Sequence, residues 1–235
     1  MLRAVVFDFN GVLVDDEPIH FRVMQRALDP EGITVDAAAY YSRLLGLDDR
    51  SSFAAVLSEA GERPEPSRIM RLVARKAAYY REAIHQEGYP FSPGAVALVR
   101  SASSAGLTLA LVSGALRDEV EGALRQAGLR GFFKAVITSE DVAEGKPDPE
   151  GYKRALTELN ALPPLPERLF HPHEVLAVED SPAGLRAAKG AGFTTLGVAQ
   201  AYSARMLGEA DFTVPSLDGL TPAQLERRFA EVSRS

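Results

Sequence analysis

The chain of 235 residues contains no cysteine. This absence excludes disulfide bridges, thiolate-bound metals and cysteine nucleophiles, and it gives no sign of an oxidising compartment. No run of about 18 consecutive apolar residues occurs, so the sequence predicts no membrane-spanning helix. The apolar stretch before Asp8 is too short for the hydrophobic region of a secretory signal. We therefore expect a globular cytoplasmic protein.

An excess of positive charge is also missing. Lys and Arg number 26 against 32 Asp and Glu, which leaves a net charge of −6. A chain with this balance has no general electrostatic attraction for nucleic acids or anionic membranes, so we expect neither as a partner. The hydrophobic fraction of 46% supplies a sizeable core, and the length predicts one or two domains.

Short apolar runs rich in Val, Ile and Leu recur along the chain without polar alternation. They are Leu2–Phe7, Leu107–Val112, Ala135–Ile137, Val175–Val178, Phe193–Val198 and, at an edge, Asp211–Val214. Such runs predict strands buried on both faces. Helical patterns accompany them at Gly94–Ala105, Arg117–Ala127, Glu150–Leu159, Pro182–Ala191 and after Thr221-Pro222. The alternation predicts an α/β fold, a doubly wound parallel sheet with a Rossmann-like core.

One segment interrupts this alternation. From about Glu17 to Glu87 the sequence has no strand-like run and several helical patterns instead. The clearest begins at Ser67, where apolar residues recur at steps of three and four. We therefore expect an inserted all-helical cap domain of residues 16–88. The core is then discontinuous and consists of residues 1–15 and 89–235.

Chemically capable residues follow four of the predicted strands. They are Asp8-Phe9-Asn10-Gly11, Ser113-Gly114, Lys146 after a short delay, and Glu179-Asp180. In open α/β sheets, ligands bind at the carboxyl ends of the strands. Carboxylates suit Mg²⁺, a lysine neutralises phosphate charge, and a carboxylate can attack phosphorus as a nucleophile. The four segments together predict a site for Mg²⁺ and phosphate.

These four segments, in this order, resemble the four motifs of the haloacid dehalogenase superfamily. The helical insert matches the cap that this superfamily places after its first motif. The stretches Asp15–His20 and Glu179–Gly184 resemble the β-phosphoglucomutase-like branch, whose members are mostly small sugar-phosphate phosphatases and mutases. The resemblance implies a Mg²⁺-dependent phosphatase that acts on a small phosphorylated metabolite through an aspartyl phosphate.

The resemblance also implies a role for each matching residue of the core. Asp8 resembles the nucleophile and would bind Mg²⁺ as well. The backbone carbonyl of Asn10 and the carboxylate of Asp180 would be further metal ligands, and Glu179 would bind the metal or its water. The remaining motif residues would handle the phosphoryl group: Ser113 and the Gly114 amide bind its oxygens, and Lys146 bridges that charge and Asp8.

Three residues of the predicted cap are candidate substrate contacts: His20, Arg50 and Lys76. Arg50 lies near the place where mutase relatives carry a substrate-binding arginine, and Lys76 is the only lysine of the cap. Each also has an ordinary interpretation, because a histidine or lysine on a helix is commonly a surface residue that covers apolar neighbours.

Position 10 departs from the family pattern. The family has an aspartate there, which protonates the leaving oxygen and later deprotonates the attacking water. Asn10 can do neither, and loss of a general acid–base costs ~10²–10⁴-fold in rate. Three explanations are open: a substrate whose leaving group needs no acid, a substitute among Asp15, Asp16 and Glu17, or a protein that binds phosphate compounds and turns them over poorly.

Other functions compete with a phosphatase. A weakly active or non-catalytic phosphate binder agrees with Asn10. A sugar phosphomutase is disfavoured because Leu45 and Asp49 stand where mutase relatives have a lysine and an arginine. A metal-free haloacid dehalogenase would have no use for the acidic pair at 179–180, and Lys76 lies too late in the cap for the Schiff-base lysine of a phosphonate hydrolase. The sequence leaves the oligomeric state open.

Overall fold

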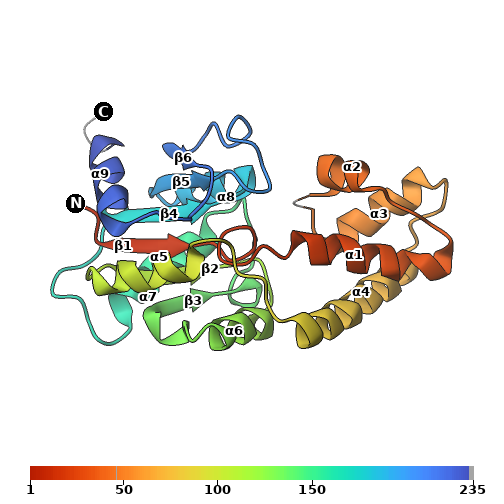
Figure 1. The fold of residues 1–235 in the computed structure, drawn as a ribbon, viewed down its shortest axis with the longest axis horizontal. Coiled ribbons are helices and arrows are strands. Elements are labelled where there is room, and N and C mark those ends of the chain that lie inside the picture. The colour runs from red at the N-terminus through yellow and green to blue at the C-terminus, as the bar shows by residue number, and fades with distance from the viewer. Residues whose placement is uncertain (46, 233–235) are drawn as a thin grey trace. The chain divides into compact units, whose positions relative to one another are not determined.

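The computed structural model describes residues 1–45 and 47–232, and the chain divides into two compact units. One unit, the core unit, comprises Met1–Asp15 and Tyr89–Ser235, and the other, the helical unit, comprises Asp16–Gly88. The chain therefore crosses from one unit to the other twice. The elements of both are labelled in Figure 1.

The core unit is built on one sheet of six parallel strands (Figure 1). The strands are β1 (Ala4–Phe7), β2 (Thr108–Val112), β3 (Phe133–Ile137), β4 (Val175–Glu179), β5 (Thr194–Val198) and β6 (Phe212–Val214). Their order across the sheet is β3-β2-β1-β4-β5-β6. The predicted doubly wound parallel sheet is confirmed, including the edge strand near residue 212.

Helices cover both faces of this sheet, which explains the unbroken apolar character of its strands. On β1, Val5 and Phe7 join the cluster formed with α5 (Ala95–Ser104), α6 (Arg117–Gln126) and α9 (Pro222–Val232). Ala4 and Val6 point to the opposite face and join the cluster formed with α7 (Glu150–Ala161) and α8 (Pro182–Gly190). Because successive side chains of a strand alternate, each residue of β1 is buried on one face or the other.

The strand order reverses beside β1, and this reversal creates the crevice in which ligands bind in such folds. β1 pairs with β2 on one side and with β4 on the other. In this register Phe7 lies between Leu111 and Val178. The residues that follow these three positions therefore emerge at the same edge of the sheet.

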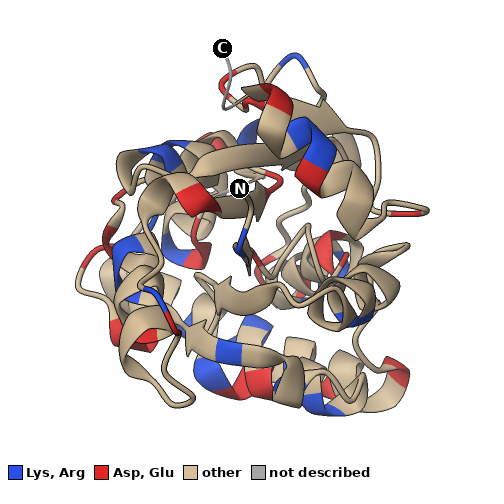
Figure 2. Cartoon of the chain, turned by 90° about the vertical axis from the view of Figure 1, so that its left-hand side faces the viewer, with Lys and Arg blue, Asp and Glu red and all other residues tan. Residues whose placement is uncertain are grey.

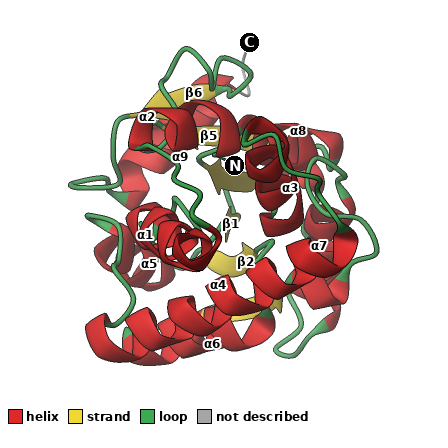
Figure 3. Ribbon diagram, turned by 90° about the vertical axis from the view of Figure 1, so that its right-hand side faces the viewer, coloured by secondary structure: helices red, strands yellow, loops and turns green. Residues whose placement is uncertain are grey.

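The described part of the helical unit, residues 16–45 and 47–88, contains helices and no strand (Figure 3). The helices are α1 (Glu17–Leu28), a 3-10 turn at Asp29–Glu31, α2 (Ala37–Ala39), a π-helical turn at Tyr40–Leu44, α3 (Asp49–Glu59) and α4 (Pro66–Glu87). Leu28, Phe53 and Leu72 pack together in its core. The helical unit thus has an apolar core of its own.

Acidic and basic residues are interspersed along the chain. In Figure 2, segments of both signs follow one another on the same helices. This mixture agrees with the small net charge of −6. None of the helices in the described residues is both long and apolar enough to cross a membrane.

Candidate active site

Asp8 lies at the carboxyl end of β1. Its backbone N–H donates to the carbonyl of Val178 at 2.9 Å, so the ladder between β1 and β4 extends to this residue and fixes its position. Its side chain is buried. The turn that follows contains Gly11 at φ +76°, a conformation that favours glycine. A Cβ atom at Gly11 would lie 1.9 Å from Oδ2 of Asp180, so this glycine also admits the neighbouring carboxylate.

Glu179 and Asp180 lie where β4 gives way to α8. Ser181 is the N-cap of α8, its hydroxyl accepts from the Gly184 N–H at 3.1 Å, and Pro182 occupies the first position of the helix. Glu179 is completely buried. A Cβ atom at Gly184 would lie 2.0 Å from its carboxylate carbon. Two glycines therefore make room for the two acidic side chains.

Three buried carboxylates meet at this edge of the sheet. One oxygen each of Asp8, Glu179 and Asp180 lies within 4.8 Å of the others. The Lys146 ammonium lies 2.5 Å from Oδ1 of Asp8 and 2.6 Å from Oε1 of Glu179. Hard oxygen donors in this number are the ligands that Mg²⁺ prefers, so the donor set fits that ion.

The charges of this cluster shift one another's protonation. Burial, followed by the negative charge of Glu179, raises the pKa of Asp8 from 3.8 to about 7, although Lys146 opposes the shift. Burial lowers the pKa of Lys146, but the charges of Asp8 and Glu179 and its hydrogen bonds to them outweigh burial and raise it above the ordinary value. Lys146 therefore carries a positive charge between two acidic groups.

Ser113 and Gly114 follow β2 at the same edge. The Ser113 N–H donates to the carbonyl of Ile137 at 2.9 Å, and its hydroxyl accepts from the Ala115 N–H at 2.9 Å. These two residues and Lys146 share a cavity of about 160 Å³. The structure thus brings the second and third predicted segments to one cavity, and Lys146 joins that cavity to the carboxylates.

Tyr152 belongs to this cluster and was not predicted from the sequence. It is fully buried, and its hydroxyl donates to Oε1 of Glu179 at 2.5 Å. Its ring centroid lies 5.7 Å from the Lys146 ammonium. On the apolar face of a predicted helix an aromatic residue is normally interpreted as core. The feature that could have identified Tyr152 is its hydroxyl, because a buried phenol hydroxyl requires a hydrogen-bond partner.

Asn10 lies in the turn after β1, where it forms an isolated bridge with Val14. The three residues that could replace an acid–base at position 10 differ in their surroundings. Asp16 is buried and accepts from the Tyr80 hydroxyl at 2.6 Å, and Glu17 accepts from the Tyr40 hydroxyl at 2.5 Å. Asp15 is exposed.

The three candidate substrate contacts of the helical unit have different environments. His20 stacks on Tyr80 with ring centroids 4.6 Å apart, and its Nε2 lies 3.3 Å from Asp16. Lys76 is buried and forms an ion pair with Asp49. Arg50 is exposed in the first turn of α3. Lys76 is thus neither a solvated lysine nor an unpaired one.

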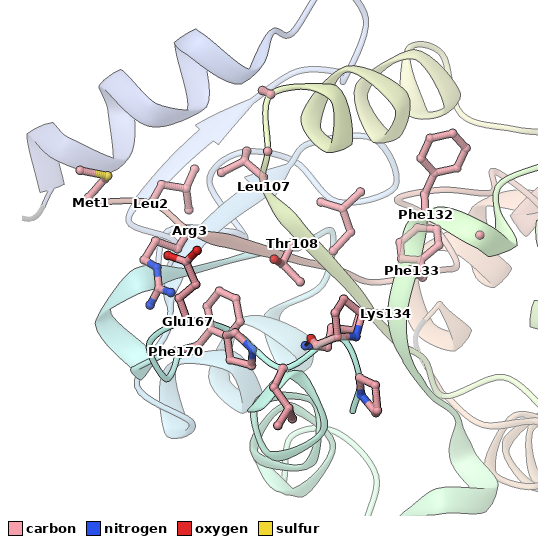
Figure 4. Close-up of a pocket in the computed structure, with 18 of the residues that line it drawn as sticks. Met1, Leu2, Arg3, Leu107, Thr108, Phe132, Phe133, Lys134, Glu167 and Phe170 are labelled. Atoms are coloured by element: carbon pink, nitrogen blue, oxygen red, sulfur yellow. Dashed lines mark hydrogen bonds between the residues drawn. The ribbon is translucent and has the colours of Figure 1, made fainter. Parts of the chain in front are cut away.

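A larger cavity, of about 870 Å³, lies at the opposite edge of the sheet, beside the start of β1 (Figure 4). Its walls include Leu2, Leu107, Phe133 and Phe170. Two basic residues that line this cavity form an ion pair or hydrogen bonds with other residues of the chain. Arg3 pairs with Glu174 at 3.0 Å, and Lys134 donates to the carbonyls of Leu159 and Pro164, each at 2.8 Å. The group of acidic residues able to hold a metal, among the described residues, is instead the one at 8, 179 and 180.

A model of the haloacid dehalogenase-like hydrolases matches residues 2–192. The chain belongs to this family. The expected superfamily resemblance is therefore confirmed, and the motif segments through Gly184 all lie inside the matched range.

Named relatives of this hydrolase include phosphatases. It is 30% identical to the validoxylamine A 7'-phosphate phosphatase of Streptomyces hygroscopicus subsp. limoneus, over 92% of this chain and 95% of that protein. It is 29% identical to the phosphorylated carbohydrates phosphatase of Thermotoga maritima, over 81% of this chain and 82% of that protein.

Solved structures share its fold. The CbbY protein of Rhodobacter sphaeroides in complex with phosphate is 27% identical, covers 96% of this chain and 100% of its own, and has a TM-score of 0.79. An aspartate-to-asparagine mutant of CbbY in complex with xylulose-1,5-bisphosphate is 28% identical, covers 96% of this chain and 99% of its own, and has the same TM-score.

Proposed function

We propose that this hydrolase is a Mg²⁺-dependent phosphatase of small phosphorylated sugars or similar phosphomonoesters. The observation that carries this proposal is the buried cluster of Asp8, Glu179 and Asp180 around the Lys146 ammonium. The names of two relatives, which act on phosphorylated carbohydrates and on validoxylamine A 7'-phosphate, support the substrate class.

The proposed metal ligands are Asp8, the backbone carbonyl of Asn10, Asp180 and Glu179. When bound, Mg²⁺ supplies positive charge that offsets the negative charge of the phosphoryl oxygens. The need for such a charge is visible in Asp8, whose pKa rises to about 7 through burial and the nearby Glu179. A nucleophilic carboxylate has to be ionised, and positive charge beside it favours that form.

The proposed reaction has two displacements at phosphorus. In the first, a carboxylate oxygen of Asp8 bonds to phosphorus while the bond from phosphorus to the ester oxygen breaks, and that oxygen takes a proton from solvent water as the alcohol leaves. In the second, water attacks the phosphorus of the aspartyl phosphate, which releases inorganic phosphate and regenerates Asp8. Ser113, the Gly114 N–H and Lys146 bind the phosphoryl oxygens in both steps, which is positioning and charge neutralisation.

Asn10 favours one refinement of this scheme, a slow second step. The side-chain amide of Asn10 takes no proton from water, so the aspartyl phosphate waits for an unassisted attack. A good leaving group needs no acid in the first step. The extreme form of this behaviour is a protein that binds phosphate compounds and turns them over poorly, and it is the second candidate function.

We also propose that the helical unit acts as a cap on the core unit. The support is its place in the sequence, directly after the Asp8 segment, and its own apolar core. A cap that closes excludes water during phosphoryl transfer. His20, Arg50 and Lys76 are the residues of this unit that we propose as substrate contacts.

The test is a hydrolysis assay over a panel of sugar phosphates and p-nitrophenyl phosphate, with Mg²⁺ and with EDTA. We expect phosphate release that requires Mg²⁺. The Asp8→Asn and Asp180→Ala variants should lose it, and Asp180→Ala should lose Mg²⁺ binding in calorimetry. Asp118→Asn, which changes an exposed aspartate in the first turn of α6, is the matched control and should keep both. Retained Mg²⁺ binding in Asp180→Ala would refute the metal assignment.

A further inference from the structure

The Glu179 carboxylate accepts hydrogen bonds from three protein side chains. Its side chain is completely buried. Oε1 accepts from the Lys146 ammonium at 2.6 Å and from the Tyr152 hydroxyl at 2.5 Å. Oε2 accepts a longer bond from the Ser181 hydroxyl at 3.3 Å. The two short contacts therefore converge on one oxygen and leave the other oriented by a weaker bond.

Tyr152 is itself rigidly placed. It lies in the first turn of α7, fully buried, and its ring meets Phe193 edge-on with centroids 5.8 Å apart at 84°. The same ring lies 5.7 Å from the Lys146 ammonium, within range of a cation–π contact. Its hydroxyl thus approaches Glu179 from a fixed point on α7, whereas Lys146 approaches from the loop that precedes this helix.

We propose that Tyr152 is a positioning residue, whose hydroxyl fixes the Glu179 carboxylate, and through it Lys146, in the geometry that binds Mg²⁺ and the phosphoryl group. This inference rests on the proposed function. The physical reason is that Lys146 is shared between Asp8 and Glu179. With the hydroxyl removed, Oε1 keeps only the ammonium as a short donor, so the carboxylate can rotate and draw Lys146 away from Asp8.

The test compares the wild-type chain with Tyr152→Phe, which keeps the ring and removes only the hydroxyl. Outer partners of metal ligands typically contribute ~10–100-fold to metal affinity or activity. We expect Mg²⁺ affinity in calorimetry to weaken within this range, with kcat reduced and the KM for the phosphomonoester changed less. Tyr40→Phe is the matched control, because it removes a phenol that donates to Glu17 at 2.5 Å in the helical unit. Its Mg²⁺ affinity should equal that of the wild-type chain.

A purely structural role predicts a different result. In that case Tyr152→Phe lowers the melting temperature, as Tyr40→Phe does, and leaves Mg²⁺ affinity unchanged, which would overturn the inference. A second measurement needs only the wild-type chain: the buried hydroxyl proton of Tyr152 should be visible by NMR and shift when Mg²⁺ is added, and an unshifted signal at saturating Mg²⁺ would also overturn it. Failure of the proposed function would give a different result: the wild-type chain would bind Mg²⁺ and hydrolyse no phosphomonoester.

Discussion

Asn10 stands where the resemblance to the family implies an aspartate, and this position carries a kinetic prediction for the proposed phosphatase. With an acyl or aryl phosphate, Asp8 should be phosphorylated without help from an acid. Water then attacks slowly because no base stands at position 10. Rapid-quench kinetics with acetyl phosphate should therefore show a burst, and intact-mass detection should show the phosphorylated chain. Asn10→Asp should raise the steady-state rate by ~10²-fold or more.

A different outcome would identify another acid–base. If the native chain hydrolyses alkyl phosphates quickly, without a burst and without gain from Asn10→Asp, the role belongs to another residue. Asp16 and Glu17 already accept hydrogen bonds from Tyr80 and Tyr40 within the helical unit, whereas Asp15 is exposed. Asp15→Asn would then be the first variant to make.

Gly184 offers a second prediction, because helix propensity and the site make opposite demands there. Alanine is favoured over glycine inside a helix by roughly 1 kcal/mol. A Cβ atom at position 184, however, would lie 2.0 Å from the buried carboxylate carbon of Glu179. Gly184→Ala should therefore lower Mg²⁺ affinity and turnover by ~10-fold or more through the displaced carboxylate, and it should lower stability because that buried group loses its hydrogen bonds to Tyr152 and Lys146. Calorimetry and thermal unfolding measure the two effects.

The control for this prediction is Gly131→Ala, because no heavy atom lies within 4 Å of a Cβ atom built at Gly131. Unchanged Mg²⁺ affinity in Gly184→Ala would show that Glu179 can move without consequence for the metal site.

The sequence predicted which residues gather at the site more readily than how they contact one another. Asp8, Ser113 and Glu179 were identifiable because each follows a buried apolar run, and parallel strands end at one edge. Tyr152 was missed because the spacing of apolar residues along a helix indicates which residues are buried and not which hydrogen bonds they form. The ion pair of Lys76 with Asp49 was missed as well, since it joins α4 to α3 across 27 positions of sequence. Such contacts depend on tertiary packing, which a local pattern does not encode.

Among the elements, those with a strong period or a clear boundary were predicted to within a few residues. β1 to β5 all overlap the predicted apolar runs, and α8 begins at Pro182, the first residue of the predicted helical pattern Pro182–Ala191. The π-helical turn at Tyr40–Leu44 was not foreseen. Tyr40 and Leu44, at its two ends, are both buried in the core of the helical unit, and no sequence period signals such a turn.

The loop before β4 carries a prediction about stability and pH. Burial alone would raise the pKa of Glu174, but hydrogen bonds from the His171 N–H, Arg168 and Arg3 outweigh it and lower the pKa from 4.5 to about 2. These hydrogen bonds connect Arg3, which precedes β1, and the loop to Glu174, which directly precedes β4. A lowered pKa means that the carboxylate stabilises the folded state fully above pH 4.5 and loses this contribution as the pH falls toward 2.

Glu174→Gln should therefore lower the free energy of unfolding at pH 7 by about 1–3 kcal/mol, the usual value for a hydrogen-bonded buried charge. The difference from the wild-type chain should shrink between pH 4.5 and 2. Urea unfolding at pH 7 and pH 2.5 measures it. Glu167→Gln, at an exposed position of the same loop, should change little at either pH. An equal loss at both pH values would mean that Glu174 acts through packing and not through its charge.

The molecule consists of two units, and among the described residues no apolar core cluster contains residues of both. The clusters at both faces of the sheet draw their residues from the core unit, and the clusters around Phe53 and Val23 draw theirs from the helical unit. Each unit therefore has the packing that rigid-body movement requires. Only two chain segments join them, at Asp15-Asp16 and at Gly88-Tyr89.

From this division we predict that the proposed cap closes on the core unit when the site is filled. Gly88, at φ +77° in the second connection, has the conformational freedom that a hinge uses. Small-angle X-ray scattering should show a smaller radius of gyration with Mg²⁺ and orthovanadate together than with neither, because a closed cap excludes water from the phosphoryl group. The Asp8→Asn variant, which removes the carboxylate that we propose as the nucleophile, separates closure from non-specific compaction by the two ions and should compact less. An unchanged scattering profile under conditions where calorimetry shows both ligands bound would mean that residues 16–88 do not act as a moving cap.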